Sequence, residues 1–135
     1  MRYAVAKKVF PLFLLLMTVM APLCSAESWQ LIGREDGSDR DYYVDFDSTW
    51  YNGVLDGGGL TKVRSTETGF SAILTLKFQN NQDGTFDVTF TNGKAYDADG
   101  KLLYGSDLNL QHHSMTGTIL SKVCQAMMDM STARI

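Results

Sequence analysis

The sequence predicts an α+β fold in which a single antiparallel meander sheet carries one C-terminal amphipathic helix on its apolar face. Apolar side chains alternate with polar ones between residues 70 and 91, which is the period of strands with one buried face. Between residues 118 and 128 apolar residues recur every three or four positions, which is the period of an amphipathic helix. A sheet with one apolar face needs a cover, and this helix is the candidate that the sequence offers.

The first strands are short. Alternation over residues 29–32 and 42–46 predicts two of them, and the acidic stretch 35–41 between them is typical of a solvated hairpin loop. Residues 60–64 predict a third strand. We interpret the glycine run 57–59 before it as a flexible connection, because it lacks the Lys and Ser or Thr of a phosphate loop.

The central hairpin has the clearest strand signal. Residues 70–79 and 86–91 alternate regularly, and residues 80–84 between them have turn chemistry. Ile73 is the one residue of the first strand that breaks the alternation.

Two further turns are predicted after this hairpin. Asn92-Gly93 is a strong two-residue turn signal, and residues 94–96 would then return as another strand. Residues 97–100 turn the chain again into a strand over 101–104. Successive hairpins of this kind give a meander.

The last predicted element is a helix over residues 118–128, whose apolar stripe contains Cys124. Ser114 or Thr116 is the expected N-cap. Residues 130–135 have no periodic pattern, so we expect them to fray.

Residues 1–26 have the pattern of a cleaved secretory signal peptide. A basic start precedes an apolar run over residues 12–21, and Cys24-Ser25-Ala26 places small residues at a cleavage site. The run is too short to span a membrane. Residues 27–135 would then form one domain that is periplasmic or secreted. Lipidation at Cys24, and with it an outer-membrane anchor, is less favoured because Leu23 stands where a small residue is normally found.

Charge and cysteine content limit the partners and the sources of stability. Cleavage would remove Arg2, Lys7 and Lys8, which leaves nine basic against fifteen acidic side chains, a net charge of -6. An acidic domain disfavours nucleic acid and anionic lipid as partners. Cys124 would then have no partner for a disulfide within its own chain. It is either buried in the core as a free thiol or paired with a cysteine of a second chain.

Residue sets that could carry chemistry are weak. The acidic stretch 35–41 lacks the alternate ligand positions of a calcium loop. His112 and His113 would point to opposite sides of an extended backbone, so we expect a surface loop and no metal site there. Ser114 beside His113 is no catalytic triad without an orienting acid and an oxyanion site. The sequence therefore predicts no catalytic residue, cofactor or metal.

An aromatic-rich first third includes Trp50 and Tyr51, which are candidates for partner contact because rigid rings provide area at low entropic cost. Packing in the core is the alternative role for these rings.

Four segments together resemble the bacterial surface-adhesin protein E-like domain family. They are residues 29–33, 41–45, 96–101 and Val123-Cys124, in the family's order and over nearly all of the predicted mature chain. The resemblance implies an antiparallel sheet with a C-terminal helix, and a founding member that is a lipidated adhesin of host matrix proteins and can dimerise. Family members commonly pair the helix cysteine with one in a central strand, but residues 70–79 contain none. No binding residue is carried over.

We therefore expect an exported, non-enzymatic protein-binding module of the cell envelope, with an envelope or host protein or a second copy of the chain as partner. Exposed aromatics or a free strand edge would make the contact. The alternative is a small periplasmic enzyme or ligand carrier that uses a cavity between sheet and helix, with His113, Ser114 or an acidic residue at its mouth.

Overall fold

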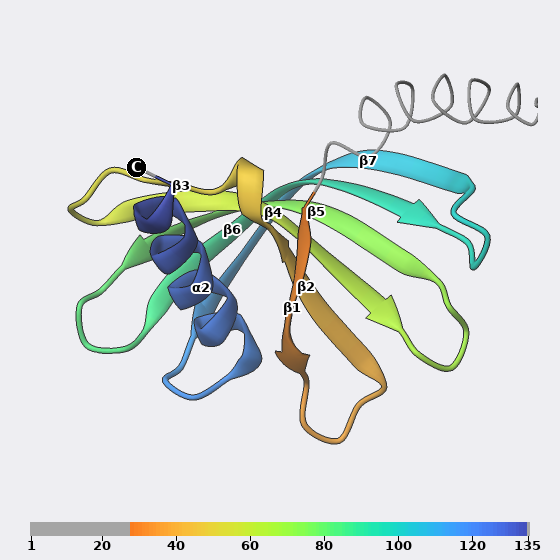
Figure 1. Cartoon of the computed structure of the whole chain (residues 1–135), viewed down its shortest axis with the longest axis horizontal. Helices are drawn as coiled ribbons and strands as arrows, with labels where there is room; N and C mark the ends of the chain where they lie inside the picture. Colours follow the sequence, from red (N-terminus) through yellow and green to blue (C-terminus); the bar gives the residue numbers. More distant parts are fainter. Residues whose placement is uncertain (1–27, 135) are drawn as a thin grey trace, which may run out of the picture.

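The computed structural model describes residues 28–134, and the predicted signal peptide with Cys24 lies outside these residues. Figure 1 shows one twisted sheet with one helix against it. The elements in chain order are β1 (Trp29–Arg34), β2 (Arg40–Asp45), the short 3-10 helix η2 (Phe46–Ser48), β3 (Trp50–Tyr51), β4 (Asp56–Ser65), β5 (Ser71–Asn80), β6 (Phe86–Tyr96), β7 (Leu102–Ser114) and α2 (Ile119–Ala133).

The sheet is an antiparallel meander. Its strand order is β1-β2-β4-β5-β6-β7, and β3 pairs with β4 beside this path. Neighbours in the chain are thus neighbours in space, as the alternating segments and turn signals predict. The predicted α+β fold class is confirmed.

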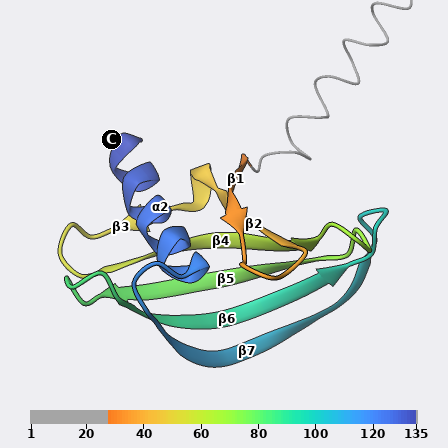
Figure 2. The same ribbon diagram turned by 90° about the horizontal axis from the view of Figure 1, so that it is seen from below.

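The core lies between α2 and one face of the sheet. α2 packs over β1 to β4, whereas β7 forms the far edge of the sheet (Figure 2). The buried apolar side chains come from both layers: Val44, Leu76, Phe78, Phe86, Val88, Val123, Cys124 and Met127. α2, with 15 residues, therefore covers only part of the sheet. The longest strand, β7 with 13 residues, lies at the edge away from the helix.

The glycine run 57–59 is not a flexible connection, so that prediction is wrong. All three glycines are buried within β4. A Cβ at Gly57 would lie 2.4 Å from the Phe78 ring, and one at Gly58 would lie 2.9 Å from the Trp50 indole nitrogen. Gly57 and Gly58 are needed because ring side chains pack directly against this strand.

The turn predicted at Asn92-Gly93 is also absent. β6 runs through both residues to Tyr96, with shifts of register against β5 and β7 close to this point. The dipeptide therefore marks an irregularity within one strand, a role that glycine also has in sheets.

The helix differs from its prediction at both ends. Its N-cap is Thr118, whose hydroxyl accepts from the Ser121 N–H, and Ser114 supports the cap through a 2.8 Å contact between the hydroxyls of Ser114 and Thr118. At the other end α2 continues to Ala133, with Ser131 buried and Met130 packed against the core. The expected fraying from residue 130 is therefore wrong for the described residues.

Candidate functional site

The far edge of the sheet is formed by β7, the longest strand of the molecule. It pairs with β6 on one side, and no strand of the described chain pairs with its other side. Residues 102–114 include no Lys, Arg or Pro, which commonly protect a sheet edge. Asp107 and two shifts of register against β6 are the protecting features that this strand does have. Strand β1 at the opposite edge has only 6 residues.

Large apolar side chains are exposed on β7. Tyr104 is 67% exposed and Leu110 is 57% exposed, and Leu102 and Leu103 are exposed as well. We call these four side chains and the free edge of the strand the β7 surface. Tyr104 pairs with Ala95 and Leu110 pairs with Phe90, so both lie on the face of the sheet that α2 partly covers. A long unpaired strand with apolar neighbours is suited to adding another strand.

At the N-terminal end of α2, the same face of the sheet has an apolar groove of about 480 Å³. We call it the helix-side groove. The apolar residues of its wall come from four strands, the turn before β5 and the helix: Tyr42, Val63, Phe70, Ala72, Leu74, Phe90, Ala95 and Leu120. The groove exists because α2 begins at Ile119 and leaves the sheet beyond that point without a second layer.

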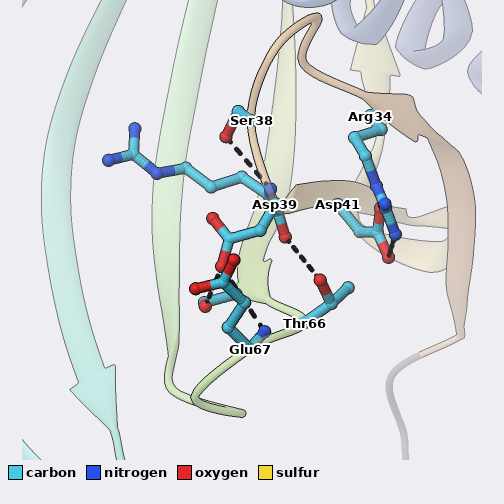
Figure 3. Close-up of polar contacts among 8 residues, drawn as sticks. Arg34, Ser38, Asp39, Asp41, Thr66 and Glu67 are labelled. Carbon is cyan, nitrogen blue, oxygen red and sulfur yellow. Dashed lines mark hydrogen bonds and ion pairs between the residues drawn. The ribbon is translucent and has the colours of Figure 1, made fainter.

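Two acidic loops lie beside one end of this groove, the β1–β2 loop and the β4–β5 turn. They form a cleft of about 500 Å³ whose wall includes Glu35, Asp36, Asp39 and Glu67. Asp39 joins the loops, because its carboxylate accepts from the Ser65 hydroxyl and its carbonyl accepts from the Thr66 hydroxyl at 3.1 Å (Figure 3). The Ser65 contact lowers the pKa of the Asp39 carboxyl.

Three arginines lie in this region. Arg34 and Arg40 have acidic partners, and the charge of Arg64 helps to lower the pKa of the Asp41 carboxyl. Arg34 Nε donates to Asp41 Oδ1 at 2.8 Å, an interaction that lowers the pKa of the Asp41 carboxyl (Figure 3). The Arg40 guanidinium lies 3.8 Å from the Glu35 carboxylate. The loops and the adjoining strand ends thus hold five carboxylates against three guanidinium groups, which leaves a negative excess at neutral pH.

The two aromatic residues predicted as partner contacts have different environments. The Trp50 side chain lies over Gly58 and is 42% exposed. The Tyr51 ring stacks on Phe78 with 6.2 Å between centroids, and its hydroxyl donates to the Val54 carbonyl at 2.8 Å. Tyr51 is therefore a packing residue of the fold. Three strands, β4, β5 and β6, separate Trp50 on β3 from the β7 surface.

Cys124 is a free thiol that is fully buried between α2 and the sheet, and no other cysteine lies among residues 28–134. Burial raises its pKa to about 12, since desolvation disfavours the thiolate. A buried, protonated thiol is a packing residue and a poor nucleophile.

His112, His113 and Ser114 are the last residues of β7, so the predicted surface loop is wrong. His113 Nδ1 lies 2.7 Å from Asp87 Oδ1, and both side chains are exposed. Ser114 is buried and points to the opposite face of the sheet. His113 and Ser114 therefore do not converge, and within residues 28–134 no three His, Cys, Asp or Glu side chains are grouped as metal ligands.

Sequence reasoning missed β7 beyond residue 104. The signal was present, because Leu108 and Leu110 alternate with Asp107, Asn109 and Gln111. This pattern would have extended the last strand to the histidines.

Among the described residues no helix is long and apolar enough to cross a membrane. Comparison with protein-family models, curated proteins and solved structures gives no match.

Proposed function

We propose that this protein is a non-enzymatic, adhesin-like binding module of the bacterial envelope, periplasmic or secreted, that takes an extended segment of another protein at the β7 surface. The partner is an envelope or host protein, or a second copy of this chain. The predicted export signal and the resemblance to surface-adhesin protein E-like domains support the location and the class of function that we propose.

The observation that carries the proposal is the free edge of β7. An edge strand offers backbone N–H and C=O groups that an added strand satisfies, and alternate side chains give the added strand its specificity. Tyr104 and Leu110 would border such a strand on the face that continues into the helix-side groove. Their burial by a partner would remove apolar surface from water.

Photo-crosslinking tests this proposal at the residue level. A photoreactive amino acid is placed at position 110 on β7, at position 115 just after it, or at position 50 on β3. We expect crosslinked partner mainly from position 110. Equal crosslinking from all three positions, or crosslinking from position 50 alone, would contradict docking at β7.

A second candidate function is a small-ligand carrier, and the helix-side groove supports it. About 480 Å³ with apolar walls is within the usual size of ligand sites. An apolar fluorescent dye tests this candidate, because a carrier should bind it with saturation and lose it in a Phe70→Ser variant. The related enzyme hypothesis places His113, Ser114 or an acidic residue at the mouth of such a cavity, and of these His113 and Ser114 lie on opposite faces of β7.

A further inference from the structure

We propose that the helix-side groove and the acidic loops beside it select a protein segment in which apolar residues are combined with Lys or Arg. This inference rests on the proposed protein-binding function and assigns the chemistry of the segment that is bound.

The groove supplies the apolar half of the recognition. Phe70 is 49% exposed, and Val63, Leu74 and Phe90 are only half-buried although they lie on the same face as the core. Tyr104 and Leu110 of the β7 surface pair with Ala95 and Phe90 of the groove wall, so the two surfaces are continuous. A bound segment would therefore have apolar side chains directed to this face.

The acidic loops supply the charge. Tyr42 lines the groove, and its hydroxyl donates to Glu35 Oε1 at 3.3 Å. Ser65 also lines the groove, and its hydroxyl donates to Asp39. The apolar wall thus ends at two carboxylates. Arg40 also lines the groove, and its guanidinium lies 3.8 Å from the Glu35 carboxylate, so one of the two already has a cationic partner.

Two other carboxylates at this end have no internal partner. Within residues 28–134, the side chains of Asp36 and Glu67 make no hydrogen bond or ion pair. A basic segment would gain attraction from these groups without breaking a contact of the fold, whereas an acidic segment would be repelled. The charge excess of the loops therefore favours a cationic partner over an anionic one.

Three synthetic peptides of equal length test this inference by fluorescence anisotropy on the purified protein. One alternates Phe and Lys, the second has Glu in place of Lys, and the third has Ser in place of Phe. We expect the Phe-Lys peptide to bind most tightly, and added salt to reduce its advantage over the Phe-Glu peptide. A fourth probe, dodecylamine, is a small molecule that combines an apolar chain with a cationic amine, as the Phe-Lys peptide combines apolar and cationic side chains.

Charge variants locate the effect. Asp36→Asn combined with Glu67→Gln should weaken binding of the Phe-Lys peptide about threefold to tenfold, the scale of two exposed ion pairs. The matched control is Asp47→Asn combined with Asp56→Asn, which removes the same charge from exposed carboxylates whose side chains make no hydrogen bond or ion pair within residues 28–134. Phe70→Ser should weaken the same peptide, with circular dichroism as the check of folding.

Several results would overturn the inference: equal affinity for the Phe-Lys and Phe-Glu peptides, equal effects of the two charge variants, or binding of dodecylamine without binding of any peptide. The crosslinks from position 110 test docking at β7 separately. Their absence would remove the proposed function, whereas equal affinity for both peptides would remove only the selection by charge.

Discussion

At the scale of single residues, three consecutive glycines shape the central part of the sheet. Gly57 makes room for the Phe78 ring, and Gly58 makes room for the indole of Trp50 and the carbonyl of Leu76. Because a glycine run is also typical of flexible loops, its role in β4 depends on rings that are distant in sequence. The sequence could not have revealed this packing.

A glycine substitution tests this packing. Gly57→Ala should lower the free energy of unfolding by about 1–3 kcal/mol, as overpacking does, because its Cβ would clash with Phe78. Gly105→Ala in β7 is the control, since its Cβ would meet nothing closer than 3.4 Å. Denaturant unfolding should show loss of stability only for Gly57→Ala, and equal effects would contradict the account.

Cys124 gives a second prediction at this scale. Because the thiol is buried and its pKa is raised to about 12, a thiol reagent should label it only after the protein is unfolded. Mass spectrometry of native and denatured samples measures this. Rapid labelling of the native protein would contradict the position of Cys124 under the sheet.

At the scale of elements, periodicity predicted what depends on local sequence. The hairpin of β5 and β6 and the existence of α2 follow from alternation and from helical spacing. The turn at Asn92-Gly93 and the fraying after residue 130 were wrong, because tertiary pairing and packing against the core outweigh local preference there.

The start of α2 can be tested by removing its cap. Thr118→Ala should cost about 1 kcal/mol of stability, since the hydroxyl of Thr118 accepts from the Ser121 N–H. Thr116→Ala is the control. It removes the same hydroxyl and methyl groups from a side chain that makes no hydrogen bond within residues 28–134. Thermal unfolding should separate the two variants, and a larger loss for Thr116→Ala would contradict the assignment of the cap.

At the scale of the whole molecule, the sheet is wider than its helical cover. α2 packs over β1 to β4, the same face has an apolar groove across β2, β4, β5 and β6 at the N-terminal end of the helix, and β7 has an open edge. The sequence predicted one sheet and one helix, but the position of the helix along the sheet is a tertiary property. The candidate site was therefore missed, although a free strand edge was among the predicted means of contact.

The acidic groups make stability depend on pH. Hydrogen bonds from Ser65, Arg34, Thr85 and His113 lower the pKa of the carboxyls of, in the same order, Asp39, Asp41, Asp83 and Asp87. A lowered pKa in the folded state adds stability above the unfolded value, about 3.9, and this stability is lost as the pH falls through the folded value. The melting temperature should therefore fall below about pH 4, and less so in an Asp41→Asn variant. Equal acid sensitivity of that variant would contradict the role of the Arg34 pair.

The most direct test of the central claim is to capture partners from envelope extract with the unmodified protein and two charge variants. Leu110→Lys places a cation on β7, and Met115→Lys places one just after the strand at the same exposure, 57%. The account predicts that the unmodified protein and Met115→Lys recover the same partner, and that Leu110→Lys loses it while remaining folded. Recovery of that partner by Leu110→Lys at full yield would contradict binding at β7.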